Sequence, residues 1–266
     1  MTSTLREVLA TLELDRVNQT FFVGTQLDGP AHHILGGHIS AQALVATART
    51  VEADRGPRIM HAQFLRSGDA RQPVDFEVVT LHDGGTFSTR RATARQFGAV
   101  LMEATVSFSK SVDSEDYQPP MPVVPAPESL ESVPVRGIWT SLEWFERRNV
   151  PADASEVARL WWRPDGQTPA DPVINAALVA YLSAVTLVEA ALAARPAATD
   201  YRLSSMLDHS VWFHQPADVS DWLLYEQLSA SGAHRRALTT GRMFSRAGTQ
   251  VCTATQELYF PRPRER

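Results

Sequence analysis

The segment GGHISAQALVATARTV at residues 36–51 decides how this chain can fold. Its apolar residues recur with the three- and four-residue spacing of an α-helix, directly after the pair Gly36-Gly37. We therefore predict a helix that begins at His38 and ends near residue 51. Most of its residues are apolar or small, so the helix needs a cover on more than one side.

A second stretch of the chain repeats this helix. NAALVAYL at 175–182 follows the pattern of AQALVATA at 41–48. Further echoes come in the same order: 61–69 with 209–218, 90–92 with 235–237, and 104–108 with 254–258. Each echo is weak alone, but their common order indicates an internal duplication.

Each copy reads as one helix followed by a run of strands. The first copy predicts strands near 60–65, 74–81, 86–96 and 100–108, and the second near 204–213, 222–229, 235–244 and 251–260. In the second copy Asp171 is a good helix cap and Pro172 a good first residue. An antiparallel sheet with one apolar face can wrap around such a helix. We predict an α+β fold, a double hot-dog with two antiparallel sheets, each wrapped around a long central helix.

A proline-rich, acidic segment separates the two copies. It runs roughly over 111–134, and its composition favours an extended connection. We therefore divide the chain into an N-terminal hot-dog domain (1–112), a linker (113–136) and a C-terminal hot-dog domain (137–266).

Composition limits the partners and the setting. The net charge of −5 argues against broad binding to nucleic acid, which needs a basic face. Cys252 is the single cysteine, so we expect no intrachain disulfide and a reducing cytoplasm. No Cys/His cluster has the spacing of metal ligands, so we also expect no metal site. The N-terminus reads as an amphipathic helix without the apolar core of a signal peptide. Polar residues interrupt the apolar stretch at 173–194, which predicts a buried helix and no membrane span.

Several longer motifs carry a resemblance to a known family. They are LGGHISAQAL at 35–44, HAQFLRSGD at 61–69, LHDGGTFSTRR at 81–91 and DHSVWFH at 208–214. Together they resemble acyl-CoA thioesterase II, the TesB-like double hot-dog family, of which the chain looks like a divergent member. The resemblance implies hydrolysis of an acyl-CoA without metal or covalent cofactor. It also implies assembly into a homo-oligomer.

The resemblance implies a site for the attacking water that only part of this sequence keeps. The family holds the water with an Asp on the second-copy helix, a Thr on the next strand and a Gln on the last strand. These positions fall on Ala184, Met206 and Gln256, so the acid and the Thr are replaced and the Gln is kept. Glu189 points about 140° away from Ala184 around a helix, so it does not substitute for the acid.

Other residues are candidates for parts of the site. Gly36 and Gly37 open a helix whose first N–H groups can polarise a thioester carbonyl. His38 follows them and is either a base or hydrogen-bonding group for the substrate, or a structural histidine. Asp208 is either a substitute acid or, as we favour, a structural hydrogen-bonding residue. Three arginines could contact CoA phosphates, which is a weaker hypothesis: Arg66, Arg90 and Arg91. Two strand histidines are expected to have structural roles: His61 and His209.

Two functions from different classes follow from this reading. The first is hydrolysis of an acyl-CoA or related acyl thioester, with Gln256 and His38 acting on the water. The second is an acyl-thioester-binding protein with weak or no hydrolysis, which the residues Ala184 and Met206 favour. A hot-dog hydratase is a third and minor alternative, because we find no Asp/His pair with suitable spacing.

Overall fold

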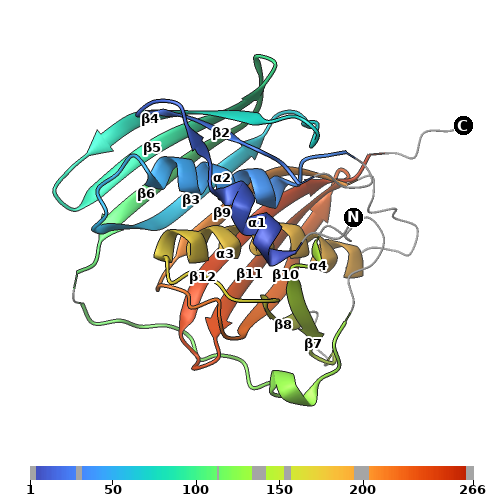
Figure 1. Cartoon of the computed structure of the whole chain (residues 1–266). Helices are drawn as coiled ribbons and strands as arrows, with labels where there is room; N and C mark the ends of the chain where they lie inside the picture. The colour runs from blue at the N-terminus through green and yellow to red at the C-terminus, as the bar shows by residue number, and fades with distance from the viewer. Residues whose placement is uncertain are drawn as a thin grey trace, which may run out of the picture.

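Two units, each a curved sheet enclosing one helix, make up the protein (Figure 1). The structure is a computed structural model that describes residues 4–27, 32–112, 114–133, 142–152, 157–194 and 204–261. The first half contains α1 (Leu5–Leu12), β1 (Asp15–Arg16), β2 (Phe21–Gly24), α2 (Gly36–Ala48), β3 (Arg55–Phe64), β4 (Val74–Asp83), β5 (Phe87–Gln96) and β6 (Ala99–Lys110). The second half contains β7 (Phe145–Asn149), β8 (Ala158–Pro164), α3 (Pro172–Thr186), α4 (Val188–Ala193), β9 (Ser205–Phe213), β10 (Leu223–Ala233), β11 (Arg236–Ser245) and β12 (Gln250–Tyr259). A short 3₁₀ helix, η1 (Pro127–Ser129), lies between the halves.

The strands form one twelve-stranded antiparallel sheet. Its order is β1-β2-β4-β5-β6-β3-β9-β12-β11-β10-β8-β7. Strands β3 and β9 pair with each other at the centre, so the sheets of the two halves join into one. The predicted double hot-dog fold is confirmed. The pairing of β3 with β9 also shows that the two sheets are continuous. Pairing the two strands also removes two exposed sheet edges.

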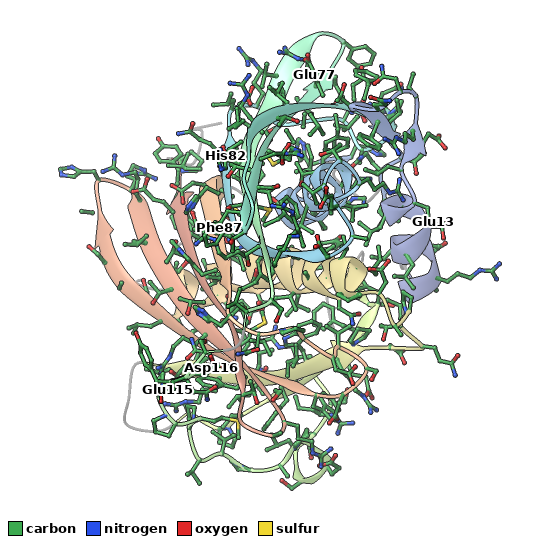
Figure 2. All side chains as sticks on the ribbon, turned by 90° about the vertical axis from the view of Figure 1, so that its left-hand side faces the viewer. Glu13, Glu77, His82, Phe87, Glu115 and Asp116 are labelled. Carbon is green, nitrogen blue, oxygen red and sulfur yellow. The ribbon has the colours of Figure 1, made fainter. Side chains whose placement is uncertain are left out.

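The central helices are nearly surrounded. Seen almost along the axis of α2, the first half of the sheet curls around this helix (Figure 2). Helix α3 begins as predicted, because Asp171 Oδ1 accepts hydrogen bonds from the N–H groups of Val173 (2.8 Å) and Ile174 (3.3 Å). The stretch Pro172–Ala193 is apolar enough to span a membrane, but 83% of its most apolar window is buried inside the protein. Burial in the core therefore explains why this stretch is so apolar.

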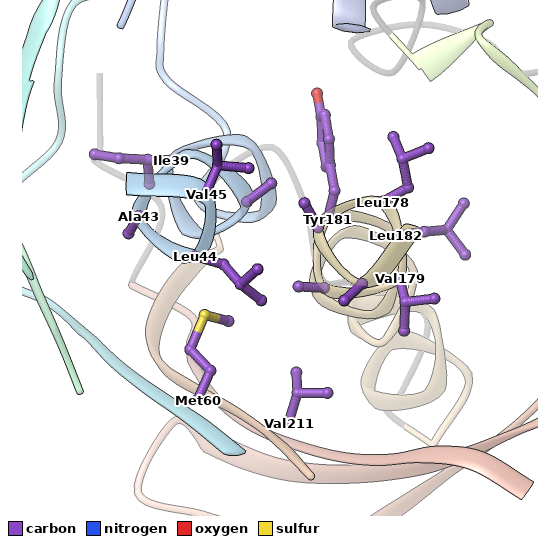
Figure 3. Packing of buried hydrophobic residues seen from close by; sticks show 14 of the residues in the cluster. Ile39, Ala43, Leu44, Val45, Met60, Leu178, Val179, Tyr181, Leu182 and Val211 are labelled. Atoms are coloured by element: carbon purple, nitrogen blue, oxygen red, sulfur yellow. The ribbon is translucent and has the colours of Figure 1, made fainter. Parts of the chain in front are cut away.

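The two helices lie side by side over the sheet, with Met60 and Val211 beneath them (Figure 3). They are in close contact at Gly37. A Cβ atom at this position would stand 2.4 Å from the backbone oxygen of Tyr181 on α3. Glycine is therefore required for the contact between α2 and α3.

The sheet register relates the two halves residue by residue. Val106 pairs with Met60, and Gln256 pairs with His209. Met60 and His209 are both fully buried, so they are equivalent positions, as are Val106 and Gln256. The sequence echo that matched His61 with His209 is wrong by one residue. A shift of one residue turns a strand side chain to the other face, and the His61 side chain is indeed exposed.

The proline-rich segment is extended, as predicted, but it is also packed. Its residues Met121, Val124 and Leu130 lie against a cluster on the outer face of the second half, formed by Trp161, Trp222, Leu224 and Phe244. Trp161 Nε1 donates a hydrogen bond of 2.9 Å to the carbonyl oxygen of Pro125. We call residues 114–133 the strap. The proposed linker ends, residues 113 and 134–136, lie outside the described residues.

A single methyl group at Gly37 tests the contact between the helices. We expect Gly37→Ala to lower the free energy of unfolding by about 1–3 kcal/mol, because overpacking a core has this cost. The matched control is Gly85→Ala in a turn, where a Cβ would meet nothing within 4 Å. Urea unfolding measures both variants. Equal stabilities for the two variants would contradict the packing.

Candidate functional site

Gln256 lies on the core-facing side of β12, between two neighbouring strands. Its ladder partners are Thr239 on β11 and His209 on β9. The side chain is only 1% exposed, and its Oε1 has no hydrogen-bond partner among the residues that the structure describes. Most buried polar atoms are hydrogen-bonded. The Gln256 oxygen therefore marks a place that can accept a hydrogen bond from a polar molecule.

His209 links this part of the sheet to α3. Its Nε2 lies 2.9 Å from the hydroxyl oxygen of Ser183, and both residues are fully buried. The hydroxyl of Tyr225 donates to the Ser183 carbonyl oxygen at 3.2 Å. Burial lowers the pKa of His209 to about 3, with the backbone of Thr255 acting in the opposite direction. The ring is therefore neutral at physiological pH.

Ala184 is buried on α3, directly after Ser183. Ser183 contacts β9, whereas Val185 packs against the first turn of α2. The position implied for the family acid thus lies beside the Ser183–His209 pair and holds only a methyl group. Glu189 binds the guanidinium of Arg147 through both carboxylate oxygens, so it has a structural partner away from this position.

Met206 brings an apolar group to the N-terminus of α2. A Cβ built at Gly36 would stand 1.9 Å from Met206 Cε and 3.2 Å from the Phe64 ring, so both side chains contact the first turn. The rest of Met206 packs against an apolar cluster formed by α4 and the ends of β11 and β12. The structure therefore brings Met206 and Gly36 together, and the methyl group covers the helix end that the sequence assigned to the thioester carbonyl.

His38 lies in the same turn and has other contacts. Its Nε2 is 2.8 Å from the Thr11 hydroxyl on α1, and its ring stacks on Tyr181 with centroids 5.4 Å apart. The side chain is 2% exposed, and burial lowers its pKa to about 3. A ring with this pKa is neutral and a weak base near pH 7. In the described structure His38 ties α1 to the start of α2.

Asp208 is half-buried beside a β-bulge between β9 and β12. Its Oδ1 accepts a hydrogen bond of 3.1 Å from the backbone N–H of Glu257. This bond lies next to the β-bulge, where the regular backbone pairing is interrupted. Burial, the largest influence, raises the pKa of its carboxyl group. Asp208 thus makes a hydrogen bond within the sheet, and its role in the site, whether substrate-binding, a substitute acid or structural, stays a prediction.

The three candidate arginines differ in exposure. Arg66 and Arg91 are exposed, as expected for strand arginines. Arg90 is 4% exposed and binds Asp83 and both oxygens of Thr50 at the end of α2. Sequence reasoning missed this burial of Arg90 and its ion pair with the half-exposed Asp83, because nothing in the pattern of β5 distinguishes Arg90 from Arg91.

Sequence reasoning also missed a second hydroxyl on α3. Thr186 Oγ1 accepts a hydrogen bond of 2.9 Å from Gln227 Nε2 on β10. Ser183 and Thr186 are three residues apart, so both face the sheet. Two hydroxyls at this spacing on an otherwise apolar helix are the signal that could have identified both contacts.

Other features of the described structure lie apart from these residues. A surface hollow of about 640 Å³ opens between α1 and the turn at 165–167, and none of the candidate site residues lines it. Among the described residues, no group of three or more His, Cys, Asp or Glu side chains is placed to hold a metal ion.

Two family models match the chain. Residues 141–259 match the acyl-CoA thioesterase model, and residues 26–109 match the model of the acyl-CoA thioesterase N-terminal domain. Among curated proteins, acyl-CoA thioesterase 2 of Haemophilus influenzae is 30% identical, over 97% of this chain and 98% of its own length. Human acyl-coenzyme A thioesterase 8 is 29% identical, over 95% of this chain and 89% of its own.

Solved structures agree with these matches. The tesB protein of Mycobacterium avium subsp. paratuberculosis superposes with a TM-score of 0.88 at 55% identity, covering 97% of this chain and 100% of that one. Acyl-CoA thioesterase II TesB2 of Mycobacterium marinum gives a TM-score of 0.86 at 32% identity, covering 97% and 99%.

The buried histidines predict a dependence of stability on pH. The unfolded chain protonates His38 and His209 near pH 6.5, whereas the folded protein does so only near pH 3. Because the unfolded state binds more protons between these values, the free energy of unfolding decreases as the pH falls through this window. Each ring contributes about 1.4 kcal/mol per pH unit.

Urea unfolding between pH 7 and pH 4 measures this dependence. His38→Gln, which can keep a hydrogen bond to Thr11, should make the slope shallower by the contribution of one ring. An unchanged slope would mean that folding does not lower the pKa of His38.

Proposed function

Because the chain belongs to the acyl-CoA thioesterase family, in its thioesterase II branch, we propose that it hydrolyses an acyl-CoA or related acyl thioester to the free acid and the thiol. The observation that carries the proposal is the buried, unpartnered Oε1 of Gln256, which lies on β12 opposite His209, the residue that contacts Ser183 on α3. The named relatives are acyl-CoA thioesterases, which supports the same reaction here.

In the proposed site each half of the chain supplies a different part. The first N–H groups of α2, at Gly36 and Gly37, lie at the positive end of the helix dipole and polarise the thioester carbonyl. Gln256 from the second half accepts a hydrogen bond from the attacking water. His38 holds the first turn of α2 in place through Thr11 and Tyr181, and Asp208 supports the strand beside Gln256.

The substitutions at Ala184 and Met206 make the reaction slow. A carboxylate that accepts the proton of water is missing at Ala184, and Met206 covers Gly36 with a methyl group. Methionine has flexible side-chain bonds, so it can withdraw when a ligand binds. These same features favour the second candidate function, an acyl-thioester-binding protein with weak or no hydrolysis.

We also propose a cytoplasmic setting and a homo-oligomer. The single cysteine, Cys252, is buried and free, which suits a reducing compartment. The strap covers the outer face of the second half, so an oligomer would form through other surfaces.

Thiol release from acyl-CoA substrates of several chain lengths tests the function. We expect slow turnover, and we expect Gln256→Leu to lower kcat at least about tenfold, since a hydrogen bond to the water is lost. Gln227→Leu is the matched control: Gln227 is an equally buried amide on β10 whose Oε1 is also unpartnered, but the proposed site does not include it, so the change should leave kcat unchanged. Ligand binding without any thiol release would decide for the binding protein.

Restoring the missing residues should speed hydrolysis. We expect the double variant Ala184→Asp, Met206→Thr to raise kcat by about 10²–10⁴-fold, the usual contribution of a general base. The control carries Ala184→Asn with Met206→Thr, which has nearly the same shape and no base. If the Asp variant is no faster than the Asn variant, Ala184 does not occupy the position of the family acid.

A further inference from the structure

A small apolar cluster, separate from the main core, lies where α4 meets the ends of β11 and β12. We call it the terminal cluster. Met206 on β9 packs against it. Its buried members, each at most 4% exposed, are Val188, Ala191, Ala237, Leu258 and Phe260.

Met206 connects the terminal cluster to the first turn of α2. A Cβ atom at Gly36 would stand 1.9 Å from Met206 Cε, so the methyl group lies against the helix end to which we assign the thioester carbonyl. The side chain of methionine is flexible and unbranched, like an alkyl chain. Met206 therefore occupies the space that an acyl chain would take if it began at this carbonyl and ran towards the terminal cluster.

The matching end of the first half is polar. The sheet register makes Ser88 on β5 the equivalent of Ala237 on β11. Arg55 Nη1 donates to Ser88 Oγ at 3.0 Å, and Ser88 Oγ donates to Asp83 Oδ1 at 2.6 Å. An alkyl chain among these groups would separate them from their hydrogen-bond partners, which costs free energy. Of these two matching ends, the one in the second half is therefore suited to an acyl chain.

We propose that the hydrolase acts on short, unbranched acyl chains, and that Met206 is the residue that sets this limit. The inference rests on the proposed thioester hydrolysis and names its substrate class. An acetyl group needs only the methyl group of Met206 to withdraw, whereas each further methylene group must displace more of the side chain. The residues of the terminal cluster are already packed against one another, so a long chain would enter only by separating them.

Chain-length profiles of the wild type and of Met206→Ala test the inference. The measurement is kcat/KM for thiol release from saturated substrates between acetyl-CoA and palmitoyl-CoA. The wild type should be fastest with butyryl-CoA or a shorter substrate. Met206→Ala leaves a cavity for about three further methylene groups. The ratio of kcat/KM for hexanoyl-CoA to that for acetyl-CoA should then rise about fourfold for each methylene group buried.

Two further variants show whether the space itself is responsible. Met206→Leu is the matched control, because leucine has a similar volume and should keep the wild-type ratio. Leu258 lies directly opposite Met206 on β12. Adding Leu258→Phe to Met206→Ala fills the space again and should return the ratio towards the wild-type value. A partly unfolded variant loses activity with all substrates alike, so the ratio reports on the site and not on stability.

A titration tests the same contact without turnover. The full-length protein, with ¹³C-labelled methionine methyl groups, is titrated with S-butyl-CoA, a thioether that has no thioester bond to hydrolyse. The methyl signal of Met206, assigned through Met206→Leu, should shift with S-butyl-CoA and stay in place with CoA alone. A signal that S-butyl-CoA leaves in place, or that CoA alone shifts equally, overturns the inference.

The kinetic outcomes distinguish this inference from the proposed function. A ratio that Met206→Ala leaves unchanged overturns the role of Met206 and leaves thioester hydrolysis standing. A wild type that is fastest with palmitoyl-CoA does the same. A wild type that releases no thiol from any substrate overturns the hydrolysis, and the titration with S-butyl-CoA then decides the role of Met206 by itself.

Discussion

The antiparallel ladder between β3 and β9 is the interaction on which the rest of the structure depends. It joins two curved sheets into one and sets the distance at which their enclosed helices meet. Because of it, the first turn of α2 lies against α3, and a residue as small as Gly37 is needed there. In the proposed site, the helix end belongs to one half and Gln256 to the other.

Much of the fold could be predicted from the sequence because its signals are local. The cap at Asp171 and the period-two strands of both copies gave elements close to those observed. Strands β1, β2, β7 and β8 were not predicted. They lie at the two ends of the sheet, and β7 consists largely of charged residues (FERRN), which suits an edge strand but hides its strand pattern.

The site was harder to predict because it depends on register. The echo of 104–108 with 254–258 agrees with the ladder, whereas the echo of Arg90 with Arg235 is wrong by four residues, since the register places Arg90 opposite Val106 and Thr239 opposite Gln256. β-Bulges in several strands shift the pairing without a clear signal in the sequence. The contact between Ser183 and His209 joins residues that only the folded chain brings together.

The positions equivalent to Gln256 and Thr239 in the first half are Val106 and Arg90, and there Arg90 closes the core with an ion pair to Asp83. The two copies thus differ at these positions. In the first half Arg90 is bound to Asp83, whereas in the second half Gln256 has a side-chain oxygen without a partner among the described residues. In the proposed site, neither copy contains a complete set of groups for the reaction. Selection for activity would then act only on the two joined halves together. Separating the halves would leave each of them with only part of the proposed site.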